Sequence, residues 1–197
     1  MNVMFIHIPK AAGTSIEKSL GLRRLRFPSR FRREFKNEGQ CSFGHLDVRK
    51  RLRNGRITKE FYDSAFKFCF CRNPYDRAVS SYFYARKRHP NEFSPSVSFI
   101  DFTRTLANYG RMFIEQTWYT DELDFDFIGR FETLERDFMW VAHKIGIKAS
   151  LRKENNTFHE PYWTYYNEES IENIAKYYRK DFEFFGYNEN DYFLTNG

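Results

Sequence analysis

The sequence begins with an apolar segment, residues 2–8, that runs directly into a turn containing lysine and glycine, FIHIPKAAGTSIEKSL. The apolar run predicts a buried strand, and the residues after the turn have helical spacing. Thr14 and Glu17 are spaced as a capping box at the start of this helix, and Gly21 is placed to end it. A strand joined to a helix by a tight turn is the building unit of parallel α/β sheets, so this segment limits the fold class more than any other.

Strands and helices continue to alternate along the rest of the chain. A helix is expected to start at Pro74, because Asn73 can cap it and proline is favoured at a first helical position. The alternation predicts a central parallel sheet with helices on both faces. At 197 residues the chain is long enough for one buried core, so we expect a single domain, residues 1–197. Further strands are expected at residues 41–44, 64–71 and 125–131, and helices at residues 74–88, 134–145 and 168–180.

The turn after the first strand has the chemistry of an anion cradle. A helix start offers backbone N–H groups and the positive end of the helix dipole. Lys10 adds a mobile positive charge, and Thr14 and Ser15 add hydroxyl groups. The turn is not a Walker A loop, GxxxxGK[ST], because its lysine precedes the glycine. It predicts phosphate binding, with a simple capped helix as the alternative.

A second segment, FCFCRNPYDRAVSSYFY, places an arginine at the end of the strand predicted at residues 64–71. Arg72 has the forked guanidinium that suits phosphate, and Ser80, on the polar face of the following helix, can add a hydroxyl. Alternatively, Arg72 only pairs with Asp76, and Arg77, on that same face, is only solvated. In parallel sheets ligands bind at the carboxyl ends of the strands, where both segments fall. Two anion sites at one edge match a nucleotide with phosphates at two positions.

Together, PKAAGTS and RNPYDRAVSSY resemble the 5′-phosphosulfate loop and the 3′-phosphate motif of sulfotransferases that use PAPS (3′-phosphoadenosine-5′-phosphosulfate). More narrowly, they are similar to the carbohydrate branch that includes the heparan sulfate 2-O-sulfotransferases and their bacterial relatives. FDFIGRFETLERDF and the tail from residue 151, with its aspartate-aromatic-Gly-Tyr pattern, are similar to later segments of that branch. The resemblance covers nearly the whole chain. It implies a P-loop NTPase-like three-layer α/β fold, PAPS as donor, PAP (adenosine 3′,5′-bisphosphate) as product, and a carbohydrate hydroxyl as acceptor.

The resemblance also places the family's binding residues on matching positions of this chain. Arg72 and Ser80 would bind the 3′-phosphate, and Asn155 and Thr157 match a polar loop that closes over the nucleotide in relatives. Lys10 would also be catalytic, because it would face the oxygen that bridges sulfur and the 5′-phosphate. Ala11 stands where relatives often have threonine. One continuous loop would hold the 5′-phosphate, and its residues are Lys10, Ala11, Ala12, Gly13, Thr14 and Ser15.

The segment FGHLDV resembles a Gly-His segment that supplies the catalytic base of the 2-O branch, which maps to His45. An imidazole with a pKa of about 6.5 can accept a proton near neutral pH. Otherwise a lone histidine is a hydrogen-bonded structural residue, as we expect for His7. Other sulfotransferase branches use a glutamate base, so Glu17 stays open as an alternative. The hypothesis is a single in-line displacement at sulfur in which Lys10 and the loop N–H groups stabilise the leaving oxygen.

Basic residues concentrate in two stretches, which hold 13 of the 32 Lys and Arg of a chain whose net charge is +6. Seven lie in residues 22–36 and six in residues 49–59, on either side of His45. They suggest an anionic partner, so the carbohydrate acceptor can be an anionic polysaccharide; a solvated basic face is the alternative. No nucleic-acid-binding fold is recognised, so no nucleic-acid partner is expected.

Two other functions stay open. One is a P-loop kinase-like nucleotide phosphotransferase, which the missing GK[ST] and the lack of an evident acidic partner for Mg²⁺ disfavour. The other is a non-catalytic polyanion-binding protein. No metal is expected in either the site or the mechanism, because the sequence has no ligand spacing such as HExxH or paired CxxC.

The remaining patterns concern cysteine and the membrane. Cys69 and Cys71 alternate with phenylalanines in an apolar run, so we expect core thiols in a reducing compartment. No apolar run approaches the ~20 residues of a membrane span, and the first apolar stretch is too short for a signal peptide. We therefore expect a cytoplasmic protein with no integral membrane segment.

Overall fold

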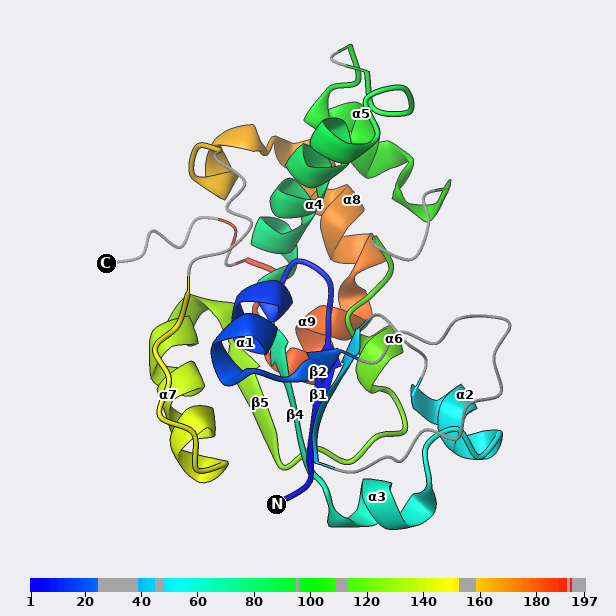
Figure 1. The fold of residues 1–197 in the computed structure, drawn as a ribbon. Helices are drawn as coiled ribbons and strands as arrows, with labels where there is room; N and C mark the ends of the chain where they lie inside the picture. The colour runs from blue at the N-terminus through cyan, green and yellow to red at the C-terminus, as the bar shows by residue number, and fades with distance from the viewer. Residues whose placement is uncertain are drawn as a thin grey trace. The chain divides into compact units, whose positions relative to one another are not determined.

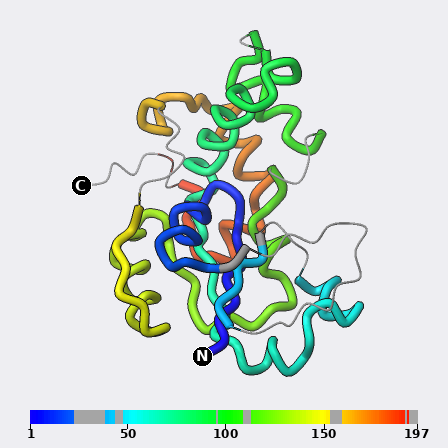
Figure 2. Tube along the Cα trace, viewed as in Figure 1, coloured from blue at the N-terminus to red at the C-terminus, as the bar shows by residue number. Residues whose placement is uncertain are grey.

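The computed structural model describes residues 1–24, 39–44, 48–94, 96–108, 113–152, 159–190 and 192. Within it the chain divides into two compact units, traced in Figures 1 and 2. Unit 1 is Met1–Cys71 with Tyr119–Asn155, and unit 2 is Arg72–Trp118 with Asn156–Gly197. That the chain is a single domain, residues 1–197, stays a prediction.

Unit 1 is built on a five-stranded sheet in the order β2-β3-β1-β4-β5, and every neighbouring pair is parallel. From β1 the chain moves to one side of the sheet for β2 and β3 and then returns to the other side for β4. This reversal puts a topological switch point beside β1, where open α/β sheets bind their ligands. The predicted α/β fold with a parallel sheet is confirmed. The strands are β1 (Val3–His7), β2 (Arg23–Arg24), β3 (Gln40–Gly44), β4 (Phe66–Cys71) and β5 (Phe127–Arg130).

The neighbouring strands β1 and β4 are buried along their whole length. All five side chains of β1 and all six of β4 are buried, as continuous apolar runs in parallel sheets require. Cys69 and Cys71 are free thiols inside β4, which confirms them as core residues. Burial raises the pKa of the Cys69 thiol well above its usual value, so the thiol stays protonated and unreactive.

The helices of unit 1 connect and flank these strands. The chain arches over the end of β1 and turns back into α1, as the blue part of the tube in Figure 2 shows. α6 (Thr117–Thr120) falls across the boundary between the units. The others are α1 (Gly13–Leu20), α2 (Val48–Arg53), α3 (Lys59–Ser64) and α7 (Leu134–Lys144), with a 3₁₀ turn η2 (Phe131–Thr133) before α7.

Unit 2 is helical. α4 (Pro74–Arg88) begins as predicted, because the Oδ1 atom of Asn73 accepts the Tyr75 N–H at 2.9 Å. The helix expected at residues 168–180 is instead two helices that meet at Tyr178. The other elements are α5 (Phe99–Arg104), η1 (Leu106–Asn108), η3 (Tyr162–Tyr165), α8 (Glu168–Tyr177) and α9 (Arg179–Phe185).

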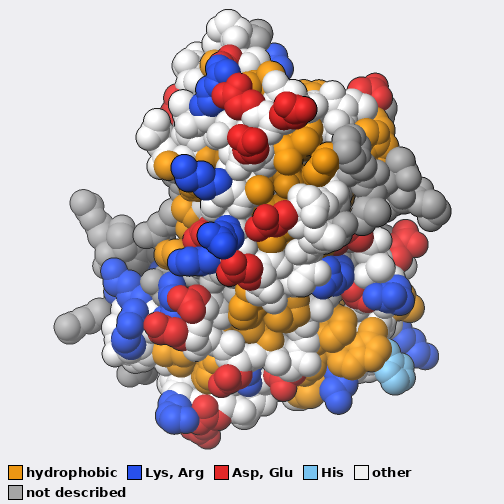
Figure 3. Space-filling model, turned by 180° about the vertical axis from the view of Figure 1, so that it is seen from behind, with side chains coloured by type: hydrophobic (Ala, Val, Ile, Leu, Met, Phe, Trp, Pro, Cys, Tyr) orange, Lys and Arg blue, Asp and Glu red, His pale blue; other side chains and the backbone are white. Residues whose placement is uncertain are grey.

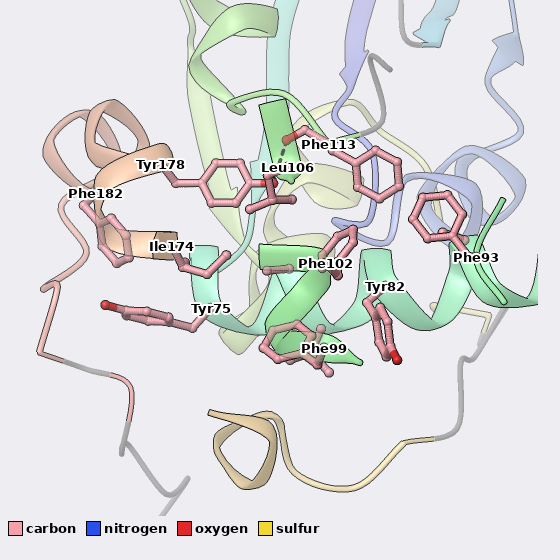
Figure 4. Packing of buried hydrophobic residues seen from close by; sticks show 13 residues of the cluster. Tyr75, Tyr82, Phe93, Phe99, Phe102, Leu106, Phe113, Ile174, Tyr178 and Phe182 are labelled. Carbon is pink, nitrogen blue, oxygen red and sulfur yellow. Dashed lines mark hydrogen bonds between the residues drawn. The ribbon is translucent and has the colours of Figure 1, made fainter. Parts of the chain in front are cut away.

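An aromatic cluster forms the core of unit 2 (Figure 4). Aromatic residues make up 20% of the sequence, and part of them pack between the helices of this unit. Tyr178 is fully buried and donates its hydroxyl to the Phe113 carbonyl at 2.6 Å. The cluster contains Tyr75, Tyr82, Phe93, Phe99, Phe102, Leu106, Phe113, Ile174, Tyr178 and Phe182 among others.

The surface carries both signs of charge. On the face drawn in Figure 3, Lys and Arg side chains are interspersed with Asp and Glu, so this face has no single-sign patch. In the described ranges no helix combines the length and apolar character needed to cross a bilayer.

Candidate functional site

The loop between β1 and α1 has an unusual backbone. Lys10 and Ala12 have positive φ angles of 67° and 59°, a conformation that residues with a β-carbon seldom adopt. Among the described non-glycine residues only Glu122 shares it. Ala11 and Gly13 have no positive φ, so the sign alternates along the loop. Successive N–H groups in such a backbone turn to one side and form an anion-binding concavity.

The start of α1 adds further N–H groups next to this concavity. Its N-cap is Ala12, and no side chain caps the helix. The predicted capping box of Thr14 and Glu17 is wrong, because the helix begins at Gly13 and Thr14 already lies within it. A helix start without a side-chain cap presents its N–H groups and positive dipole end to other acceptors, including anions.

The Glu17 carboxylate has a different partner set. Its Oε1 atom lies 2.8 Å from His7 Nδ1 and accepts a hydrogen bond from the Ser42 hydroxyl. All three residues are buried, with exposures of 4% for His7, 6% for Glu17 and 0% for Ser42. The network fastens α1 to β1 and β3, which confirms His7 as a hydrogen-bonded structural residue. The alternative role of Glu17 as the catalytic base stays a prediction, and its carboxylate already has these two hydrogen-bond partners.

Gly13 is required by space rather than by its φ angle. A β-carbon there would lie 2.2 Å from both Cδ2 and Nε2 of His7, far inside contact distance. The imidazole therefore packs directly against the backbone at the start of α1. His7 sets how closely the loop approaches the sheet, and only glycine fits above it.

Arg72 follows the last residue of β4 and belongs to unit 2. Its Nε and Nη2 atoms donate to the two carboxylate oxygens of Asp76 at 2.8 and 2.7 Å, so the pairing with Asp76 that was considered as the alternative to phosphate binding exists. Its main chain is held as well. The Arg72 N–H donates to Gln116 Oε1, and the Arg72 carbonyl accepts from Gln116 Nε2, both at 2.9 Å.

The expected polar face of α4 is not solvated. Ser80 is 3% exposed and Arg77 is fully buried, so the alternative in which Arg77 is only solvated is wrong. Arg77 Nη1 lies 3.9 Å from Asp181 Oδ2, and Nη2 donates to the Ile114 carbonyl at 2.8 Å. The guanidinium also lies 5.4 Å from the centre of the Tyr178 ring. A buried arginine is tolerated here because its charge lies beside the Asp181 carboxylate and its Nη2 atom is hydrogen-bonded.

Two functional candidates were missed from the sequence, Gln116 and Asp181. Asp181 is fully buried and accepts the N–H groups of Gln116 and Thr117 at 2.8 and 2.9 Å. Burial raises the pKa of Asp181, although Arg77 and these hydrogen bonds oppose the shift. The tail pattern marked the region of Asp181, but a lone glutamine between elements carries no periodicity or motif.

The remaining predicted residues divide into two groups. His45, Asn155 and Thr157 lie outside the described residues, so their roles stay predictions. The loop residues come together as one continuous turn into α1, with Ala11 and Ser15 buried. That this turn and Arg72 hold two phosphates of one nucleotide also stays a prediction.

Comparison with known proteins identifies the family. The model of the sulfotransferase family matches residues 1–188. An uncharacterized protein of Archaeoglobus fulgidus is 38% identical over 111 residues, and the match covers 54% of this chain and 88% of the length of that relative. Carbohydrate sulfotransferase 10 of Xenopus laevis is 24% identical over 193 residues, covering 75% of this chain; the match spans only about half, 52%, of that relative. No solved structure matches. The chain therefore belongs to the sulfotransferase family of PAPS-dependent transferases.

Proposed function

We propose that this protein transfers a sulfuryl group from PAPS to a hydroxyl group of a carbohydrate. The observation that carries the proposal is the backbone between β1 and α1, where Lys10 and Ala12 are left-handed. Such residues cost about 1–2 kcal/mol each, and strain of this kind persists mainly at functional sites. A strained turn that gathers N–H groups at a helix start without a side-chain cap suits a 5′-phosphosulfate.

Each group of residues has a separate role in an in-line displacement. When bound, PAPS supplies the sulfuryl group and a 5′-phosphate as leaving group. The loop N–H groups and the hydroxyls of Thr14 and Ser15 hold that phosphate. Lys10 meets the bridging oxygen, which keeps the electron pair of the broken S–O bond. His45 takes the proton of the acceptor hydroxyl as its oxygen bonds to sulfur.

Arg72 and Ser80, in unit 2, are the residues proposed to bind the 3′-phosphate. Arg72 is oriented in advance, because its bidentate pair with Asp76 and its main-chain bonds to Gln116 fix both ends of the residue. Ser80 adds a hydroxyl, and the family resemblance assigns Asn155 and Thr157 to nucleotide binding. We assign the preference for PAP over nucleotides without a 3′-phosphate to Arg72 and Ser80.

Calorimetry with three ligands tests the donor and separates the alternatives. We expect heat with PAP and none with ATP–Mg²⁺. Binding of ATP–Mg²⁺ alone would favour the phosphotransferase, and binding of an anionic polysaccharide alone would favour the non-catalytic binder. Absence of binding to PAP would refute the proposal.

Replacing Lys10 tests the chemistry. We expect Lys10→Ala to lower turnover about 10²–10³-fold, as loss of a charge-stabilising donor does, while PAP affinity changes less than about tenfold. Lys18→Ala is the matched control, because Lys18 is an exposed lysine in the last turn of α1. Unchanged turnover in Lys10→Ala would reject its assigned role.

The basic helix α2 supports an acidic acceptor. Its six residues include Arg49, Lys50, Arg51 and Arg53; Arg49 pairs with Asp121 at 2.9 Å, and Lys50 and Arg53 are exposed. We propose that it attracts an acidic glycan, as in the heparan sulfate 2-O branch. A screen with labelled PAPS and glycans of different charge tests this. The transfer rate should be highest with acidic glycans and should fall as salt rises. Equal rates with neutral glycans would contradict the assignment.

A further inference from the structure

Gln116 is a buried amide whose side chain is devoted to the main chain of Arg72. It is 0% exposed, and both of its polar atoms bond to Arg72 at 2.9 Å. The amide oxygen accepts the Arg72 N–H, and the amide nitrogen donates to the Arg72 carbonyl. This closed pair fixes the peptide groups on both sides of the Arg72 α-carbon, at the point where the chain leaves β4.

The main chain of Gln116 is itself hydrogen-bonded to a residue of helix α9. The Asp181 carboxylate accepts the Gln116 N–H at 2.8 Å through Oδ2. Its other oxygen accepts the N–H of Thr117 at 2.9 Å and the Thr117 hydroxyl at 3.1 Å. Three donors converge on one buried carboxylate, so the backbone at Gln116 has little freedom to move.

The segment before Gln116 is anchored as well. Arg77 donates to the Ile114 carbonyl at 2.8 Å and lies 3.9 Å from Asp181. The Tyr178 hydroxyl donates to the Phe113 carbonyl at 2.6 Å, the bond drawn in Figure 4. Two helices, α4 and α9, and the residue between α8 and α9 therefore hold this segment in place.

We propose that Gln116 is a positioning residue for the 3′-phosphate, acting through Arg72. Asp181 and Arg77 hold the backbone at Gln116 in place. The inference rests on the proposed function, because it takes Arg72 as the residue that binds the 3′-phosphate. With the main chain fixed by Gln116 and the guanidinium fixed by Asp76, the arginine fork is ordered before the nucleotide arrives. Less rotamer freedom is then lost on binding.

The test compares two nucleotides that differ only in the 3′-phosphate, PAP and adenosine 5′-phosphate. Gln116→Met keeps a side chain of similar length and removes both hydrogen bonds to Arg72. We expect the dissociation constant for PAP to rise about tenfold and that for adenosine 5′-phosphate to stay within about twofold. Gln116→Asn, whose shorter amide cannot make both bonds, should give an intermediate loss and serves if Gln116→Met does not fold.

Ser170→Ala is the matched control. Ser170 is also fully buried in unit 2, and its described hydrogen bonds are to Asn167 in the capping box of α8. It should lower the melting temperature without changing the ratio of the two affinities. An unchanged ratio in the Gln116 variants, or an equal loss for both nucleotides, overturns the inference while leaving the donor assignment intact. If the unaltered protein shows no preference for PAP over adenosine 5′-phosphate, the 3′-phosphate role of Arg72 fails, and the role of Gln116 fails with it.

Discussion

The contact between His7 and Gly13 predicts a specific rescue by a second mutation. In Gly13→Ala the new β-carbon would lie 2.2 Å from two atoms of the His7 ring. The ring cannot swing away freely, because its Nδ1 atom is bonded to the buried Glu17 carboxylate at 2.8 Å. We therefore expect Gly13→Ala to destabilise the protein through this one side chain.

The magnitude can be worked from the contacts. Overpacking in a filled interior costs about 1–3 kcal/mol, and weakening the bond to Glu17 adds to it, so about 2–3 kcal/mol is expected for Gly13→Ala. His7→Ala removes the ring and one donor to Glu17, at a similar cost of about 2–3 kcal/mol. Without the ring, alanine at position 13 fits. The double mutant should then lose about 2–3 kcal/mol rather than the sum of about 4–6 kcal/mol.

Urea unfolding of the four proteins in the cycle measures these differences. Gly129→Ala is the matched control, because a β-carbon there would lie 2.5 Å from Cε1 of Phe70 rather than near His7. His7→Ala should not rescue it, so that pair should be additive. If the His7 and Gly13 losses also add, His7 is not what excludes a side chain from position 13.

Two further predictions concern stability. Burial raises the pKa of Asp137, but hydrogen bonds from the Arg130 N–H, Thr133 and Arg136 outweigh it and leave the pKa below its ordinary 3.8. A lowered native pKa contributes stability that is present above the unfolded pKa and is lost as pH falls through the native pKa, so the destabilisation by Asp137→Asn at pH 7 should shrink below about pH 4; an equal loss at both pH values in urea titrations would contradict this. Arg77→Ala leaves the Asp181 carboxylate buried without its cation, and should cost about 3–5 kcal/mol of unfolding free energy. A loss below about 1 kcal/mol would mean that the pair is not coupled.

Much of the fold was predictable because its signals are local. The apolar runs of β1 and β4 and the Asn73-Pro74 start of α4 each carry their own evidence in a few residues. The N-cap of α1 was predicted two residues too late, at Thr14 rather than Ala12. Ala12 has a left-handed backbone, and an alanine in the sequence gives no sign of that conformation. Local sequence patterns therefore predicted where the loop lies in the chain but not the conformation of its backbone.

The burial of Arg77 could not be predicted from helical periodicity, which assigns an arginine to the solvent side. It is buried because a carboxylate from a distant part of the chain, Asp181, lies beside it. Gln116 was missed for a related reason, because the role that we propose for it depends on two hydrogen bonds to a residue far away in sequence. The residues that we propose to bind the donor belong to motifs in the sequence, whereas Gln116 and Asp181, which we propose to hold Arg72 in place, do not.

The order of the chain through the two units limits how the protein can be divided. Unit 1 is completed only when Tyr119–Asn155 joins Met1–Cys71, so unit 2 starts before unit 1 is finished. A fragment that stops at Cys71 lacks β5 and leaves β4, with its six buried side chains, as an open sheet edge prone to aggregation. Neither truncation nor a single proteolytic cut can release unit 1 intact, and on the ribosome its last strand must wait until the first segment of unit 2 has been made.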